Sequence, residues 1–305
     1  MSKSAILSSS IAKKYWMALT GLFLCLFLVG HLLGNLQLIF ITGEEGKRAF
    51  NEYAYFMTHN PAVKVLSYLT YISILFHAID GLILAIQNKK ARPQNYAYNK
   101  PSANSGLPSR YMAILGTVVL VFICTHMVNF WGKMHFETLP LHTIEKPVEY
   151  NVGQNPQTGE MMTNSIDVNF VLTTNGEYKE YSFMNPRTNE EEILFDVKND
   201  TELYDKKTEL KTAEGYKDLH GLVLSFFGKN QSGHPENPNA VVFTLLYVIS
   251  MAVLAFHLWH GFSSAFQSLG FRVKSYAKPI EAFGKLFAIL VPALFAIIPI
   301  VICFL

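Results

Sequence analysis

Five long runs of apolar residues constrain the fold of this chain more than any other feature. A helix needs about 20 mostly apolar residues to cross the roughly 30 Å hydrocarbon layer of a bilayer. The runs that meet this length are residues 15–41, 62–87, 110–132, 240–266 and 283–305. Because lipid offers the backbone no hydrogen-bonding partner, each run must be helical. We therefore expect an all-α membrane protein built on a bundle of five transmembrane helices.

The charged residues indicate how the bundle is oriented. Residues 134–239 carry 18 acidic and 9 basic side chains, a net charge of −9, whereas the rest of the chain has 5 acidic and 16 basic ones, a net charge of +11. The basic side chains gather before the first span (Lys3, Lys13, Lys14), between the second and third (Lys89, Lys90, Arg92, Lys100, Arg110) and before the fifth (Arg272, Lys274, Lys278, Lys285). The positive-inside rule places these regions in the cytoplasm. The N-terminus is then cytoplasmic, and the C-terminus and residues 134–239 are extracytoplasmic.

The long segment between the third and fourth spans differs from the rest in composition. Its polar part, residues 145–215, contains strand-like runs at 167–173 and 178–183. The turn signals Asn155–Pro156, Asn175–Gly176 and Asn185–Pro186 separate such runs. We expect three regions: helices 1–3 in residues 1–133, a β-rich extracytoplasmic insertion in 134–239, and helices 4–5 in 240–305. Asp218–Phe227 is amphipathic and predicts an interfacial helix at the end of the insertion.

Four of the ten histidines lie deep inside separate spans: His31, His77, His126 and His257. A single such histidine can simply form a hydrogen bond to a neighbouring helix, but an ionisable group in a span also marks a candidate functional site. At a rise of about 1.5 Å per residue, each lies roughly 21–24 Å along its own span. Because successive helices run in opposite directions, His31 and His126 should lie near the outer face, and His77 and His257 near the inner face. Two levels with two histidines each are what two haems with bis-histidine ligation require.

The spacing of the histidines does not identify the fourth haem ligand, and a missing motif argues against one kind of haem. His260 follows His257 by three residues, so either histidine could bind the inner haem on spacing alone. The other five histidines lie in loops or at interfaces, where we expect solvated side chains: His59, His135, His142, His220 and His234. No CxxCH motif is present, so a covalently attached c-type haem is not expected. The three cysteines each lie in an apolar run, which indicates small buried side chains and no disulfide framework.

The sequence around the four histidines resembles a known family. The runs GHLLGNLQ, ILFHAIDG, SRYMAILG…FICTHMVNFW and AFHLWHGFSSAFQSLG resemble the cytochrome b subunit of succinate dehydrogenases and fumarate reductases, of the single-subunit, five-helix, dihaem type. The resemblance covers the five spans and excludes residues 145–215. It implies that His31 and His126 bind one haem b, and that His77 and His257 bind the other. The family's fourth ligand follows a Phe and precedes a Gly by four positions, which favours His257 over His260.

The resemblance also implies partners and a location. A flavoprotein subunit, which would hold the succinate site, and an iron–sulfur subunit would dock on the cytoplasmic side, in the cytoplasmic membrane of a bacterium. Electrons would pass between succinate and a quinone, usually menaquinone, as in respiratory complex II of the tricarboxylic acid cycle. An oligomer of the complex is compatible with this reading. Besides these subunits, the expected partners are the quinone and the lipid bilayer, with no nucleic acid.

Four further residues are candidates for binding or catalysis. Glu52 lies 21 residues after His31 and is the nearest match to a glutamate that serves the outer quinone site in some fumarate reductases; an exposed loop acid is the alternative. Lys14, Arg110 and Lys274 lie at inner ends of spans, where a cation could pair with a haem propionate. The positive-inside rule would also explain those three cations. Some relatives carry a glutamate for proton transfer at the position of Ala255, so such a path is not expected here.

Two other functions fit parts of the pattern. One is a stand-alone dihaem cytochrome b that transfers electrons or handles quinol without a flavoprotein. The other is a transporter with a histidine proton relay, which would bind no haem and should have helices interrupted by Gly or Pro. The spans are largely unbroken, since Pro292 and Pro299 fall only in the last one. The transporter is therefore the least favoured.

Overall fold

Five helices of the computed structural model are long and apolar enough to cross a membrane. The structure describes residues 9–91, 94, 106–154 and 161–305. The five helices are α2 (Ser10–Phe40), α4 (Pro61–Lys90), the continuous run of α7 (Met112–His126), η1 (Met127–Gly132) and α8 (Lys133–Phe136), α10 (Ala240–Ser268) and α11 (Lys274–Phe304). A four-residue helix, α6 (Leu107–Arg110), precedes α7. The prediction of a helical membrane protein with a small β-rich part is confirmed.

Local sequence explains where the first two of these helices begin. The side chain of Ser9 accepts a hydrogen bond from the amide of Ile11 and so caps α2. Asn60 caps α4 in the same way, and Pro61 takes the first helical position, where its missing amide hydrogen costs nothing. The third helix changes geometry after His126, because η1 is a π-helical turn. Such turns are rare and often lie at functional sites.

The segment after the first span is a helix, although we expected a loop there. This helix, α3 (Gly43–His59), buries Phe50 among core residues of α2, α10 and α11. Tyr53 lies so close to α2 that a Cβ on Gly34 would be 2.7 Å from its ring. The prediction failed because α3 is short and rich in charged residues, so no long apolar run marks it.

The insertion forms two antiparallel meanders. One contains β1 (Thr143–Gln154), β2 (Met161–Leu172), β3 (Tyr178–Met184) and β4 (Glu191–Ile193), and the other contains β5 (Phe195–Lys198), β6 (Glu202–Asp205) and β7 (Lys211–Glu214). Gly176 adopts a positive φ of 84° in the predicted turn between β2 and β3. Asn185 accepts a hydrogen bond from the amide of Arg187 in the predicted turn after β3. Asn155 and Pro156 lie outside the described residues.

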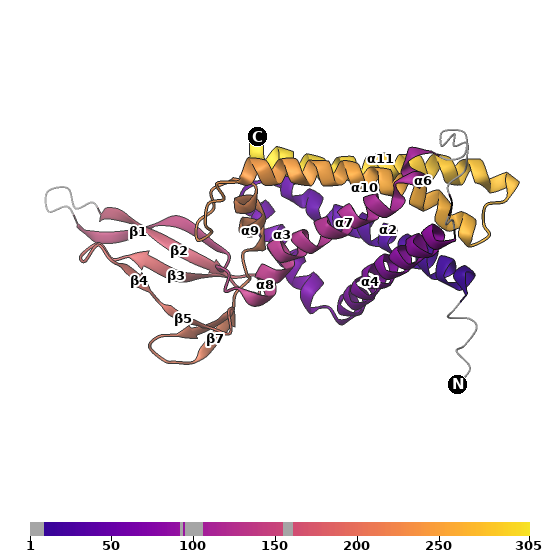
Figure 1. The fold of residues 1–305 in the computed structure, drawn as a ribbon. Coiled ribbons are helices and arrows are strands. Elements are labelled where there is room, and N and C mark those ends of the chain that lie inside the picture. The colour runs from indigo at the N-terminus through magenta and orange to yellow at the C-terminus, as the bar shows by residue number, and fades with distance from the viewer. Residues whose placement is uncertain (1–8, 92–93, 95–105, 155–160) are drawn as a thin grey trace.

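A short helix joins the sheets to the bundle. This helix, α9 (Leu219–Phe226), lies in the segment predicted to be an interfacial helix, but much of it is buried. Phe226 packs against Phe130, Phe243 and Tyr247 of the bundle. Figure 1 shows α9 and the sheets at one end of the bundle and the N-terminus at the other, with the C-terminus on the α9 side. We call these the sheet end and the basic end.

The helices pack unequally. Among the described residues, α10 and α11 bury seven side chains or glycines each. In contrast, α4 buries only Thr70 and Leu84, and α7 buries none. The helices that carry His77 and His126 therefore leave much of their surface uncovered by protein.

Candidate functional site

The histidine pair nearer the sheet end joins α2 to α7. The ring centroids of His31 and His126 are 5.8 Å apart, with the ring planes at 88°. The Tyr247 hydroxyl of α10 lies 3.4 Å from His126 Nδ1, and the Asn35 amide nitrogen lies 3.5 Å from His31 Nδ1. Aromatic side chains surround the pair: Phe27, Phe122, Phe130 and Phe295. We call this the upper pair.

The other pair joins α4 to α10 near the basic end. The ring centroids of His77 and His257 are 6.2 Å apart, with the planes at 68°. His77 Nδ1 lies 3.2 Å from the Met17 carbonyl oxygen and 3.3 Å from Thr20 Oγ1. A carbonyl can only accept, so His77 Nδ1–H donates and Nε2 keeps its lone pair. A neutral imidazole fixed in this way is suited to bind a metal through Nε2. We call this the lower pair.

The separation between the pairs can be followed along three helices. On α2, Met17 and Thr20 contact His77 of the lower pair, whereas His31 belongs to the upper pair. On α10 the contacts are at His257 and Tyr247, and on α7 they are at Gly116 and His126. At about 1.5 Å per residue, each helix gives a spacing of roughly 15–20 Å. The histidines therefore lie at two distinct levels, in the combination that their depths in the spans predicted.

Two glycines on the facing helices leave room for the rings of the lower pair. A Cβ on Gly21 would lie 3.1 Å from His77 Cε1, and one on Gly116 would lie 3.5 Å from His257 Cε1. The glycines that flank the histidines in sequence have other neighbours. Gly30 faces open space, and Gly34 accommodates Tyr53. Sequence reasoning missed Gly21 and Gly116 because each faces a histidine on another helix.

The separation of the two rings in each pair is compatible with two imidazoles that share one haem iron. Two imidazoles that bind one iron, with nitrogen–metal distances of about 2 Å, have ring centroids about 6 Å apart. The measured separations of 5.8 and 6.2 Å match this value. Within the described part of the chain, no group of three or more His, Cys, Asp or Glu side chains could hold a metal. A haem needs only two protein ligands because its ring supplies the other four.

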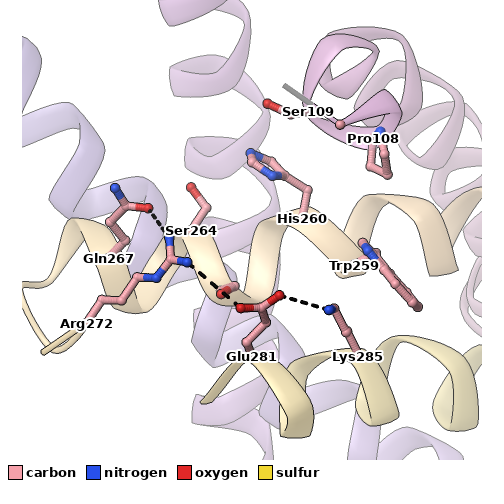
Figure 2. Close-up of a pocket in the computed structure, with 11 residues that line it drawn as sticks. Pro108, Ser109, Trp259, His260, Ser264, Gln267, Arg272, Glu281 and Lys285 are labelled. Carbon is pink, nitrogen blue, oxygen red and sulfur yellow. Dashed lines mark hydrogen bonds and ion pairs between the residues drawn. The ribbon is translucent and has the colours of Figure 1, made fainter. Parts of the chain in front are cut away.

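The basic end contains a cleft beside the lower pair. His260 and Trp259 of α10 line it together with Ser109 of α6, and Figure 2 shows Arg272, Glu281 and Lys285 around the same space. Glu281 Oε1 is 2.8 Å from Lys285 Nζ, and its other oxygen is 3.9 Å from Arg272. His260 therefore faces this cleft, whereas His257 faces His77. Sequence reasoning did not single out Arg272, Glu281 or Lys285 as a group.

The three cations proposed to bind propionates lie at the end of the bundle that contains the lower pair. Lys14, Arg110 and Lys274 are all exposed at the basic end. In the part of the chain that the structure describes, no ion pair includes any of them. Their positions fit the positive-inside distribution, and their role toward a haem stays a prediction.

Glu52 lies on α3 and not in a loop. Its carboxylate accepts a hydrogen bond from Arg48 Nε at 2.8 Å, and Arg48 Nη2 in turn donates to the Gly176 carbonyl of the β2–β3 turn. At 3.6 residues per turn, Glu52 is about 200° around α3 from the buried Phe50. Its side chain therefore faces the sheets, and not the helix core that contains the upper pair.

A second cleft, of about 350 Å³, opens at the sheet end between α3, α8 and the β5–β7 sheet. His59 and His135 lie in it, with their Nδ1 atoms 2.9 and 2.8 Å from the carbonyls of Tyr55 and Trp131. His59 also stacks on Tyr55, with ring centroids 3.8 Å apart, and His135 lies against Trp131 at 4.3 Å with the ring planes tilted by 31°. Their Nε2 atoms are thus the ones available to a ligand. We had expected both histidines to be ordinary solvated side chains.

No protein-family model, curated protein or solved structure matches the chain.

Proposed function

We propose that this chain is a dihaem cytochrome b that anchors a succinate:quinone oxidoreductase in the membrane. In this role it passes electrons between the complex's iron–sulfur subunit and a quinone. The observation that carries the proposal is the placement of four histidines in two facing pairs at two levels of the bundle. The proposal that the complex is succinate-linked rests in addition on the sequence resemblance around those histidines.

Each pair would hold one haem b. His31 and His126 would bind the haem near the sheet end, and His77 and His257 the haem near the basic end. When bound, a haem supplies a one-electron carrier whose potential depends on its axial ligands and surroundings. The residues of the chain orient the ligands: Met17 and Thr20 hold His77, and Tyr247 contacts His126. The loose packing of α4 and α7 is compatible with cofactors that cover part of their surfaces.

The charge distribution supports an orientation of the bundle in the membrane. With the basic end in the cytoplasm, the flavoprotein and iron–sulfur subunits would dock there, next to the lower pair. The sheets would then lie outside. Electrons from succinate would reach the lower haem first and continue to the upper haem, so a quinone, with menaquinone expected, would react near the sheet end.

Haem quantitation tests this function directly. The intact purified protein should contain two non-covalent haems b per chain in a pyridine haemochrome assay. A protein with no haem would favour the transporter, and a value of one would refute the two-pair scheme. Subunit analysis of the same preparation separates the two redox proposals. A complex with bound flavin supports the anchor, whereas an isolated cytochrome supports the stand-alone protein.

The quinone site is tested by three variants at the sheet end. Glu52→Gln should retain both haems and partner succinate activity with artificial acceptors, but lower quinone-linked turnover by about 10²-fold, the scale of a positioned acid or base. To take part, the Glu52 carboxylate would have to leave Arg48. His59→Gln and His135→Gln are the comparison, because these side chains line the cleft. Loss of turnover in the histidine variants alone would remove Glu52 from the mechanism and place the acid or base in the cleft.

A further inference from the structure

A cluster of buried polar side chains lies where the sheets meet α3 and α9. We call it the junction cluster. Its members are Lys47, Asn51, His142, Asp218, His220 and His234. Asn51, His142 and Asp218 are at most 2% exposed, and the other two histidines are less than 10% exposed. None of these residues belongs to the histidine pairs, so the proposed electron transfer does not use them.

Asp218 is the acceptor at the centre of the cluster. Its Oδ2 lies 2.9 Å from Lys47 Nζ and 3.5 Å from His234 Nε2. Its Oδ1 accepts from Asn51 Nδ2 at 3.0 Å and from the Gly221 amide at 2.9 Å. A buried carboxylate with this many donors is stabilised in its charged form. The cluster thus contains one buried negative charge, and Lys47 provides the positive charge that balances it.

The orientation of Asn51 fixes the protonation state of His142. Asn51 Oδ1 accepts from the His220 backbone amide at 2.8 Å, so its Nδ2 must be the atom that faces Asp218. The same Nδ2 is 3.2 Å from His142 Nδ1. An amide nitrogen can only donate, so His142 Nδ1 must accept and carries no proton. Protonation of His142 at Nδ1 would replace this hydrogen bond with repulsion between two donors.

Neither His142 nor His220 has a spare partner for a second proton. His142 Nε2 and His220 Nδ1 are buried without a hydrogen bond in the described structure. The charged and titratable groups around them are Glu44, Lys47, Arg48 and Glu52 of α3, Lys146 of β1, Tyr178 of β3, Asp218, and His234 of the segment after α9. Lys47 and Arg48 oppose a positive His142, and Asp218 favours it but is already paired. A charged histidine here would be poorly compensated.

Besides an aromatic contact between Tyr55 and Tyr216, whose ring centroids are 5.2 Å apart, further contacts between α3 and the sheets are polar. Lys47 donates to the Thr143 carbonyl at 3.2 Å, and Arg48 to the Gly176 carbonyl at 3.4 Å. Lys146 lies 3.7 Å from Glu44, in a pair exposed enough to contribute little. The buried cluster therefore supplies more of the polar contacts at this interface than the exposed pairs do.

We propose that the junction cluster is an acid-sensitive lock, which holds the inserted sheets on α3 at neutral pH and releases them as the pH falls. The titrating groups are His142 and His220. Asn51 is the positioning residue that joins both histidines to Asp218.

The pKa values of His142 and His220 are both lowered, as their surroundings would lead one to expect. Burial, followed by the charge of Lys47, lowers the pKa of His142 from 6.5 to about 4. Burial likewise lowers the pKa of His220. A released histidine binds protons more readily than a docked one, so docking weakens as the pH falls through the interval from about 6.5 to about 4. Burial alone would raise the pKa of Asp218, but His234, Lys47, Asn51 and the Gly221 amide together lower it, so that its contribution is lost only at more acidic pH.

Hydrogen exchange on the full-length purified protein tests the lock. Exchange rates of backbone amides in residues 43–59 and 143–172, corrected for intrinsic chemistry, should rise reversibly between pH 7.5 and pH 5. Each histidine that gains a proton can raise the released fraction by up to about tenfold per pH unit. Amides within α10 and α11, which do not touch the cluster, should show no such change.

Variants separate the lock from a general effect of acid. His142→Gln and His220→Gln each remove one titrating group, so each single variant should show a shallower pH profile than the wild type. The double variant should show a flat profile, either at the protected level or, if docking fails, at the exposed level. His135→Gln replaces an exposed histidine outside the cluster and should keep the wild-type profile. Unchanged exchange from pH 7.5 to 5 in the wild type would overturn the proposal. So would a full wild-type pH response in both cluster variants. Both outcomes are independent of haem content, so they do not bear on the proposed electron transfer.

Discussion

The two histidine pairs have similar geometry but are held by different means. At the lower pair, His77 donates to a backbone carbonyl of α2, and glycines on facing helices touch both rings. At the upper pair, the neighbours of the ring nitrogens are side chains, Tyr247 and Asn35, and phenylalanines surround the rings. A backbone acceptor cannot be removed by substitution, whereas a side-chain partner can. We therefore expect larger side chains at the glycines to reduce haem binding at the lower pair. At the upper pair, we expect the loss of a hydrogen bond to change the haem potential.

The largest expected effect comes from removing a ligand. His31→Ala and His126→Ala should each lose one haem and leave the same remaining component in a potentiometric titration. His77→Ala and His257→Ala should leave the other component, because each haem needs both of its axial ligands. His260→Ala is the control and should retain both haems. If the His31 and His77 variants lost the same component, the division into two levels would be wrong.

A bulky residue should disturb only the lower pair. In Gly21→Leu, the first added carbon already lies 3.1 Å from His77 Cε1, so the rest of the side chain must displace the ring. We expect haem content to fall from two toward one per chain, with loss of the component that His77→Ala also loses. Gly30→Leu on the same helix is the matched control, because a Cβ there meets no atom within 4 Å. An equal loss in both variants would indicate a general effect on α2 and not contact with His77.

The smallest expected effect is on the upper pair. If His126 binds iron through Nε2, its Nδ1–H donates to the Tyr247 hydroxyl, which makes the ligand more basic and favours oxidised iron. Tyr247→Phe should keep both haems and raise the potential of the upper component by at most about 60 mV, the equivalent of one hydrogen bond. Potentiometric titration would show this shift in the component that His77→Ala retains. A shift confined to the other component would reverse the assignment of Tyr247.

The spans and the histidine levels could be predicted because each depends on a local pattern. An apolar run of sufficient length identifies a membrane helix, and a constant rise converts residue number into depth. The contacts that orient the rings were not predictable in this way. His77 contacts Met17 and leaves no room for a side chain at Gly21, both on another helix. The length of an apolar run predicts neither the rotation of α2 nor which helix lies next to it.

The junction cluster is harder to predict from the sequence. Asn51 lies 91 residues from His142 and 167 residues from Asp218, and the insertion brings them together only after it has folded. Its three histidines looked like ordinary loop residues because the surrounding sequence is polar. Burial of these side chains depends on how the sheets, α3 and α9 close over one another.

The π-helical turn after His126 also changes how the third transmembrane helix must be compared with others. A single π turn accommodates one more residue than an α turn, which rotates everything after it by about 100° relative to a regular helix. Phe122 and His126 therefore share a face ahead of η1, while Trp131 inside η1 and His135 beyond it share a different face. A helical wheel drawn through residues 112–136 loses register at Met127. Deleting one residue from η1 would restore regular geometry and turn His135 away from the cleft, while His126 stayed in place.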